Sequence, residues 1–310
     1  MKHAVITGPT GAIGVALIEK LIQEGVRISA VCRPGSERIK GLPKNDLLKI
    51  IECDVSDLLN LPRLIKEKCD IFYHFAWKGT VGDARNDMNL QVQNIKFAVD
   101  AVEAAKKLGC KTFIGAGSQA EYGRVSGVLH ANTPVKPENG YGMAKLCAGQ
   151  MTKVLCQKYH IRHIWTRILS VYGPHDGKKT MIISAMNSLI KGQVPAFTKG
   201  EQKWDYLYSK DAANIMYLLG EKGKDQNTYC LGSGTARPLK EYIEILRKCV
   251  SPEGKIELGK IPYAENQVMY LCADILPIEQ DLGYQCQYSF ERGIEETYQW
   301  IKKEQYNEEN

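Results

Sequence analysis

Three side chains, Ser118, Tyr141 and Lys145, have the types and spacing to move a proton to or from an alcohol oxygen. Tyr141 and Lys145 stand four residues apart in YGMAK, so they share one face of a helix. A phenol with a pKa of about 10 is a poor base at neutral pH, but a nearby ammonium stabilises the phenolate and lowers that pKa. Ser118 ends the apolar stretch KTFIGAGS and could bond the same oxygen. The pattern predicts proton transfer at Tyr141 coupled to hydride transfer at a nicotinamide.

The motif TGPTGAIG, residues 7–14, follows a strand-like run and precedes a helical pattern. Free N–H groups at a helix N-terminus attract a diphosphate, although glycine also occurs in ordinary strand-to-helix turns. We expect Gly8 to permit the turn, Gly11 to admit the phosphates and Gly14 to let the helix pack on the sheet. The expected backbone contacts to a dinucleotide come from Gly8, Thr10, Gly11, Ala12, Ile13 and Gly14.

The end of the second expected strand, AVCRPGSER, bears on the choice between NAD and NADP. Many NAD sites place an acidic residue at this strand end, whereas an arginine nearby accommodates the additional phosphate of NADP. Here Cys32 takes the expected acidic position, and Arg33, Ser36 and Arg38 follow. This pattern favours NADP(H), with NAD(H) as the alternative. Solvated loop charges are the alternative interpretation of the two arginines.

Alternating strands and helices position these side chains. Strand-like runs occur at 3–7, 26–32, 46–54, 70–76, 111–118 and 163–169, and long helical patterns at 86–108 and 141–159. The alternation predicts an α/β fold with a Rossmann-type, doubly wound parallel sheet. We expect residues 1–172 to form the NAD(P)-binding domain and 205–230 to return to it. Residues 173–310 are expected to form a smaller mixed substrate domain.

The composition of the chain limits the kinds of molecule that it is expected to bind. The 310 residues carry a formal charge of +6, with 44% hydrophobic and 25% charged residues. Lysines and arginines are scattered, which argues against nucleic acid, and no apolar run has membrane-spanning length. The ten cysteines lack metal-ligand spacing, so reduced thiols in a cytoplasmic protein and no metal site are expected.

The ordered motifs TGPTGAIG, HFAWKG, GSQAEYG, YGMAK and RILSVYGP resemble those of the extended short-chain dehydrogenase/reductase family. That family includes NAD(P)-dependent sugar-nucleotide epimerases, dehydratases and ketoreductases, and the resemblance covers nearly the whole chain. It implies a catalytic triad of Ser118, Tyr141 and Lys145, a sugar-nucleotide substrate, and a homodimer paired through helices near 86–108 and 141–159. The resemblance further implies cofactor contacts from Asp54, Val55, Ala76, Tyr141, Lys145 and Ile168, and substrate contacts from Ser118, Gln119 and Ser170.

The chain departs from the family's motifs at several positions, and these departures limit which of the family's reactions is expected. The 4,6-dehydratases carry Asp and Glu where this chain has Gln119 and Ala120, so dehydration is disfavoured. Segments 172–176 and 208–211 resemble GDP-fucose synthase, which makes His175 a candidate proton donor, with a solvated or structural histidine as the alternative. Where this chain has Trp204, epimerases usually have an arginine that binds the diphosphate. Trp204 is expected to pack in the core or the domain interface, or to stack on the substrate. Lys203 and Arg237 are the candidates for that missing charge.

These observations predict an NADPH-dependent reductase of a nucleotide-linked 4-keto sugar, with the proton supplied by Tyr141. The alternative is a sugar-nucleotide epimerase that retains NAD⁺. A non-catalytic sensor of NADP(H) is a third hypothesis, which the intact set of Ser118, Tyr141 and Lys145 disfavours.

Overall fold

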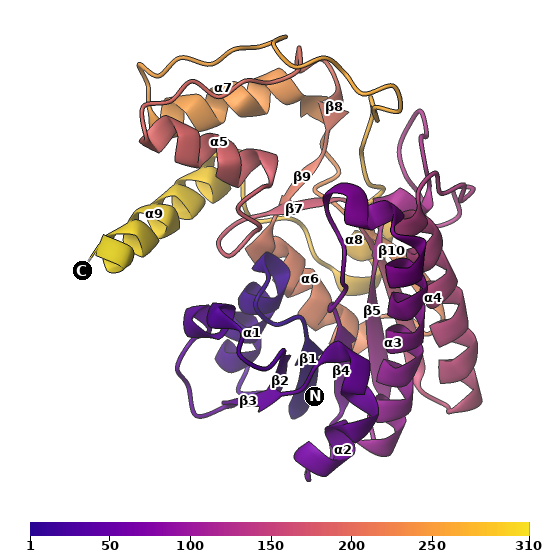
Figure 1. Ribbon diagram of the computed structural model, residues 1–310. Coiled ribbons are helices and arrows are strands. Elements are labelled where there is room, and N and C mark those ends of the chain that lie inside the picture. The colour runs from indigo at the N-terminus through magenta and orange to yellow at the C-terminus, as the bar shows by residue number, and fades with distance from the viewer. Residues whose placement is uncertain (310) are drawn as a thin grey trace.

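The computed structural model describes residues 1–309 and contains a seven-stranded parallel sheet (Figure 1). The spatial order is β10-β6-β5-β4-β1-β2-β3, which reverses direction between β1 and β4. Open α/β sheets bind ligands at such a switch point. The predicted Rossmann-type fold is therefore confirmed. The strands are β1 (His3–Thr7), β2 (Arg27–Cys32), β3 (Leu48–Glu52), β4 (Ile71–His74), β5 (Thr112–Ser118), β6 (Arg162–Ile168) and β10 (Asn227–Leu231).

Helices cover both faces of this sheet because its strands are apolar on both sides. Ile6 of β1 packs in the core beneath α1 (Ala12–Gln23) and α6 (Ser209–Lys222), whereas its neighbour Val5 packs in the opposite core. That opposite face is covered by α2 (Leu61–Leu64), α3 (Met88–Lys107) and α4 (Gly140–Lys158). Within residues 1–309, no helix has both the length and the apolar character needed to cross a bilayer.

Short segments follow the carboxyl ends of several strands and form the edge of the sheet where the site lies. They are the 3₁₀ segments η1 (Glu37–Gly41), η2 (Val55–Asn60), η3 (Gly82–Asn86) and η4 (Gln119–Glu121), of which η2 is kinked at Asp57. Because parallel strands place all their carboxyl ends at one edge, these segments gather beside the glycine turn.

A second, smaller body stands above this edge (Figure 1). It contains α5 (Met181–Ile190), α7 (Leu239–Val250) and α9 (Phe290–Glu309), whose core includes Tyr172, Tyr208 and Phe290. Two small sheets link the bodies: β7 (Ser170–Tyr172) with β9 (Tyr206–Tyr208), and β8 (Lys203–Trp204) with β11 (Arg237–Pro238). The short α8 (Leu276–Leu282) packs against α6.

The segment 205–230, expected to return to the NAD(P)-binding domain, contributes two strands and a helix that have different packing partners. β9 pairs with β7, the strand at the end of residues 1–172, and does not join the large sheet. The following helix α6 packs against α1, and β10 pairs in parallel with β6 at the sheet edge. Hydrophobic periodicity could not distinguish these partners, because both sheets offer a buried strand position.

Candidate functional site

The three glycines of the turn between β1 and α1 differ in how much space a side chain would have. Gly8 has φ +69°, and a Cβ there would lie 2.8 Å from the backbone nitrogen of Ala76. A Cβ at Gly14 would lie 2.6 Å from the carbonyl oxygen of Gly8, so Gly14 lets α1 pack on the turn itself. At Gly11, the N-cap of α1, the nearest such atom is 4.0 Å away and no side chain caps the helix. This open helix N-terminus fits a diphosphate.

Arg38 connects this turn to the loop after β7. Its guanidinium donates hydrogen bonds of 2.7 Å to the backbone oxygens of Thr10 and His175. Arg33 is exposed, and Ser36 is the half-buried N-cap of η1. Arg38 thus already bonds two carbonyl groups, and Arg33 is the exposed cation at the tip of β2.

His175 packs away from the residues of the predicted triad. Its ring centroid lies 4.9 Å from that of Trp300, and the ring also faces Gly41. It lines a cavity of about 180 Å³ beside α1. Burial and the nearby Arg38 lower the pKa of His175 to about 4. These contacts favour a structural role over the predicted role as proton donor.

Ser118, Tyr141 and Lys145 come together at the carboxyl edge of the sheet. β5 ends at Ser118, and the side chain of Asn139 caps the start of α4 by accepting from Gly142 N at 2.8 Å, which places Tyr141 in the first turn. Tyr141 is 9% exposed and its phenol interacts with the Ser118 hydroxyl. Lys145 lies with Nζ 5.7 Å from the Tyr141 ring centroid and donates to the Ala116 oxygen at 2.6 Å.

Burial dominates the electrostatics of this pair. It raises the pKa of Tyr141, while the Ser118 hydroxyl and the Arg85 guanidinium act to lower it. Burial also lowers the pKa of Lys145 to about 7, opposed by the charge of Glu121. A desolvated site favours the neutral form of both groups. Burial thus outweighs the groups that lower the pKa of Tyr141.

Arg85 of η3 was not singled out in the sequence. Its guanidinium lies 4.4 Å from the centroid of the Tyr141 ring, within the range of a cation–π interaction. Trp77 meets the same ring edge-on, with 6.2 Å between centroids. Both residues come from the irregular chain after β4, where no spacing rule indicates contact with α4.

The other expected cofactor residues lie along the same edge. Asp54 caps η2, accepts a hydrogen bond from Ser56 N at 2.9 Å and pairs with Lys78 at 3.0 Å, and these contacts help lower its pKa to about 2. Val55 is the first residue of η2, and Ala76 follows β4. Ile168 ends β6 in register with Ser118.

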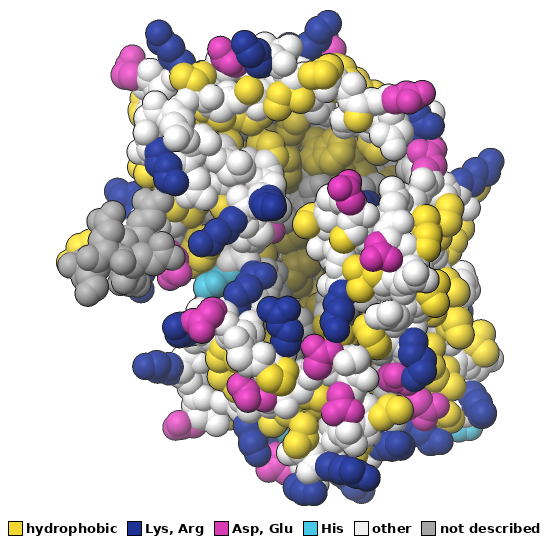
Figure 2. Space-filling view, viewed as in Figure 1, with side chains coloured by type: hydrophobic (Ala, Val, Ile, Leu, Met, Phe, Trp, Pro, Cys, Tyr) yellow, Lys and Arg dark blue, Asp and Glu magenta, His cyan; other side chains and the backbone are white. Residues whose placement is uncertain are grey.

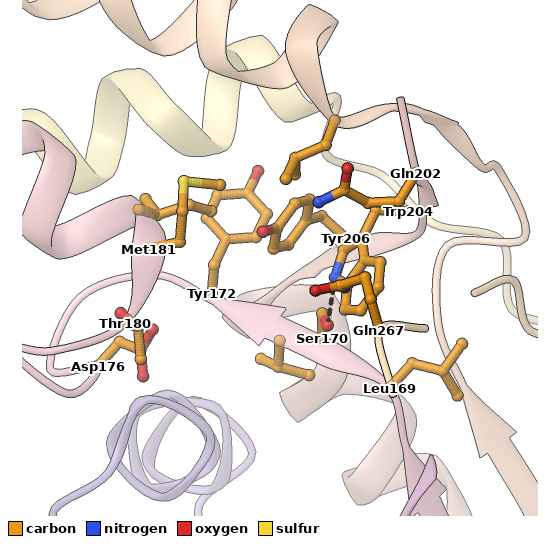
Figure 3. Close-up of a pocket in the computed structure, with 13 residues that line it drawn as sticks. Leu169, Ser170, Tyr172, Asp176, Thr180, Met181, Gln202, Trp204, Tyr206 and Gln267 are labelled. Atoms are coloured by element: carbon orange, nitrogen blue, oxygen red, sulfur yellow. Dashed lines mark hydrogen bonds between the residues drawn. The ribbon is translucent and has the colours of Figure 1, made fainter. Parts of the chain in front are cut away.

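A cavity of about 390 Å³ lies between the sheet edge and the upper body. Figure 2 shows a hollow there, with apolar side chains in its wall and lysines and arginines around its lower rim. In Figure 3, Trp204 Nε1 donates to Ser170 Oγ at 2.7 Å, while Asp176 and Thr180 lie at the other end of the cavity. Gln202 and Gln267 add amide groups to the lining.

The cavity lining contains no lysine or arginine among residues 1–309. Lys203 is exposed in β8. Arg237 stands opposite Trp204 in the β8–β11 pair and bonds Glu291 at 3.2 Å. Gln119, half-buried in η4, lies next to Ser118. The predicted diphosphate grip by Lys203 or Arg237 thus requires a side chain to move toward the cavity.

Comparison with protein families matches residues 4–232 to the model described as NAD dependent epimerase/dehydratase family. The chain belongs to this family. Membership confirms the resemblance drawn from the motifs and the prediction that the protein is an enzyme of the extended short-chain dehydrogenase/reductase type. The family's dependence on NAD supports NAD(H), the alternative cofactor, and not the predicted preference for NADP(H).

Relatives in this epimerase/dehydratase family match over almost the full length. The dTDP-glucose 4,6-dehydratase of Neisseria gonorrhoeae is 22% identical over 96% of this chain and 95% of its own. An epimerase from Methanothermobacter thermautotrophicus has a TM-score of 0.90 at 20% identity, covering 99% of this chain and 94% of its own. A UDP-N-acetylglucosamine 4-epimerase from Methanobrevibacter ruminantium has a TM-score of 0.88 at 21% identity, covering 98% of this chain and 99% of its own. These structures share the fold of this chain.

Proposed function

We propose that the protein is an epimerase of a sugar nucleotide that keeps its NAD⁺ bound between turnovers. The observation that carries this proposal is the convergence of Ser118, Tyr141 and Lys145 at the carboxyl edge of the sheet, the edge that also bears the open helix N-terminus at Gly11. Solved relatives of the same fold include epimerases, one of them with a UDP-sugar acid bound. The epimerase alternative therefore has more support than the ketoreductase predicted first.

The chain's own residues supply the proton transfers. Tyr141, as the phenolate, accepts the proton of a sugar hydroxyl, and the Ser118 hydroxyl hydrogen-bonds the same oxygen. The Lys145 ammonium stabilises the phenolate when both groups are charged. NAD⁺ held at the turn of Gly8, Gly11 and Gly14 would supply a hydride acceptor and, in its reduced form, a hydride donor. Tyr141 then gives the proton back to the oxygen.

Dehydration is disfavoured by the residues that follow Ser118. Gln119 is an amide and Ala120 has no functional group, so η4 offers neither an acid nor a base at the positions where the dehydratases carry them. Glu121 is fully buried and bound to Arg167, so it does not face a substrate. We therefore place the protein among the epimerases of its family, although the curated relatives include dehydratases.

The second candidate is the NADP(H)-dependent reductase of a 4-keto sugar nucleotide. It is favoured by the tip of β2, where Cys32 replaces a carboxylate and Arg33 is exposed. Arg38 adds little to this case, because its guanidinium already bonds two backbone oxygens.

We also propose a homodimer formed through α3 and α4, which lie side by side. Apolar side chains are exposed on both helices: Met88, Val92, Met143, Met151 and Val154. In α4, Met143, Cys147, Met151 and Val154 recur at helical spacing and form one stripe.

The nicotinamide carried by the purified protein tests the proposed function. Denatured protein should release a stoichiometric amount of NAD⁺ without added cofactor, and the native protein should interconvert epimers among UDP- and dTDP-linked hexoses. Tyr141→Phe should lower kcat by about 100-fold or more while retaining the nucleotide. A protein that is empty as purified and consumes NADPH only with a 4-keto sugar nucleotide would establish the reductase instead.

A further inference from the structure

A buried carboxylate, Glu121, lies directly behind the predicted triad. It is 0% exposed, and one of its oxygens accepts from the backbone nitrogen of Ser118 at 2.8 Å and from Trp165 Nε1 at 3.0 Å. Its other oxygen accepts from Arg167 Nε at 2.8 Å. Buried charges persist only where partners compensate the lost hydration. Glu121 is therefore held in one position and holds the backbone of Ser118 in turn.

Glycines make room for this arrangement. A Cβ at Gly117 would overlap the Glu121 carboxylate and the indole nitrogen of Trp165. A Cβ at Gly115 or Gly149 would overlap the Trp165 ring, which lies between β5 and α4. The three glycines thus form a slot for the indole, and the slot directs its N–H at Glu121.

Arg167 completes the network from β6. Its Nη1 donates to the oxygen of Ala131 at 3.0 Å, and its guanidinium lies 4.5 Å from the Tyr122 ring centroid. The side chain is almost fully buried. An arginine stays charged even when desolvated, so Arg167 provides a fixed positive charge beside the Glu121 carboxylate.

The charge of Glu121 acts on the proton-transfer groups. It raises the pKa of Tyr141 and opposes the lowering of the pKa of Lys145. The described contacts of Lys145 include no carboxylate; its Nζ bonds the Ala116 oxygen and lies 3.8 Å from the Trp77 ring centroid.

The other groups facing Tyr141 and Lys145 come from different elements. Ser118 ends β5 and Arg85 lies in η3. His74 ends β4 and is buried; its pKa is lowered to about 3 by burial and the charge of Lys145. Since Ser118, Arg85 and His74 carry no negative charge, Glu121 is the anion among the described residues that acts on both Tyr141 and Lys145.

We propose that Glu121 and Arg167 are positioning residues for the catalytic triad, a buried ion pair that holds Ser118 in place and balances the charge around Tyr141 and Lys145. The inference rests on the proposed function only in taking Tyr141 and Lys145 as the groups that exchange the proton. Neither Glu121 nor Arg167 touches the substrate.

Glu121→Gln tests the role of the charge, because the amide keeps the shape and an oxygen for Ser118 and Trp165. With Arg167 left uncompensated, the pKa values of Tyr141 and Lys145 both fall. Both limbs of the profile of kcat against pH should therefore move to lower pH by about one unit. Arg167→Lys keeps the charge, so its profile should stay in place even if kcat falls.

A matched control is Glu244→Gln, which removes one carboxylate from an ion pair with Arg247 on α7, in the upper body. Its profile should match that of the wild type. A Glu121→Gln profile that also coincides with the wild type, or an Arg167→Lys profile that moves as far, would overturn the proposal, because a purely structural role lowers kcat without shifting the limbs.

A measurement without turnover separates this inference from the proposed function. In protein with ¹³C-labelled tyrosine, the Cζ resonance that disappears in Tyr141→Phe reports the titration of Tyr141. That titration should also move to lower pH in Glu121→Gln, whatever substrate the enzyme uses; an unmoved titration contradicts the inference. Absence of epimerase activity in the wild type contradicts only the proposed function.

If Glu121→Gln does not fold, Glu121→Asp tests the positioning of Ser118. The shorter carboxylate keeps its charge but withdraws from the Ser118 nitrogen. We expect kcat to fall by about tenfold, with the pH profile in place and the bound NAD⁺ retained. An unchanged kcat would overturn the positioning role.

Discussion

Lys145 is a lysine whose amino group is buried at the edge of the sheet where the reaction is proposed to occur. It is 3% exposed, and burial lowers its pKa from 10.5 to about 7. Because the unfolded chain binds this proton more tightly than the folded chain, the residue costs stability below the folded pKa. The fold thus tolerates a destabilising side chain at the position where the proposed chemistry needs it.

Lys145→Met should stabilise the protein while abolishing turnover. At pH 7 we expect the free energy of unfolding to rise by about 1–4 kcal/mol, because an apolar side chain of similar length replaces a buried charge. The cost of Lys145 is fully present below pH 7 and disappears as the pH rises toward 10.5. Urea denaturation between pH 6 and 10 should show the gap narrowing with pH. A less stable variant at pH 7 would contradict this account.

At the scale of elements, the turn between β1 and α1 combines two glycines with different tasks. Gly14 is needed by the fold, because a Cβ there would meet the carbonyl oxygen of Gly8 at 2.6 Å. Gly11 faces open space, with its nearest such atom 4.0 Å away, so the folded chain alone does not require glycine there. The space at Gly11 is therefore available to the proposed diphosphate.

Gly11→Ala and Gly14→Ala form a matched pair of variants. Gly11→Ala should leave the melting temperature of nucleotide-free protein unchanged but weaken NAD⁺ binding by about tenfold or more, because its methyl group occupies the space for the diphosphate. Gly14→Ala should lower the free energy of unfolding by about 1–3 kcal/mol through overpacking. Thermal melting and calorimetric titration with NAD⁺ measure the two effects. Equal NAD⁺ affinity in Gly11→Ala and the wild type would remove the diphosphate from this position.

At the scale of the whole molecule, the cavity between the two bodies and the proposed dimer surface lie on different parts of the protein. The sheet edge carries the proposed reacting groups, and the upper body closes the cavity with Trp204 and Tyr206. The exposed stripe on α4 lies on the other side of the sheet from α1, away from this cavity. A dimer through α3 and α4 therefore leaves the substrate entrance open.

Charged substitutions in the α4 stripe test the dimer. Met151→Lys with Val154→Glu should convert the protein to a monomer in sedimentation velocity, because charges in an apolar interface oppose association. Val194→Glu, at an exposed valine in the upper body, is the control and should leave the dimer intact. A wild type that sediments as a monomer at micromolar concentration would exclude this interface.

Local pattern alone determined the alternating elements, the glycine turn and the shared face of Tyr141 and Lys145, because periodicity and short motifs act within a few residues. It also placed Ser118 at a strand end, and the fold and family predicted from these motifs are confirmed. The catalytic roles of these residues stay predictions.

Only the tertiary structure decided which distant groups meet. It paired Glu121 with Arg167, 46 residues away, and engaged Arg38 with the loop at His175, 137 residues away. It also packed His175 on Trp300 and joined β9 to β7. Such partners depend on the three-dimensional course of the chain, and no spacing in the sequence encodes them. The glycines that flank Trp165 were visible throughout, but their purpose, to let an indole reach a buried carboxylate, appears only once β5, β6 and α4 are packed together.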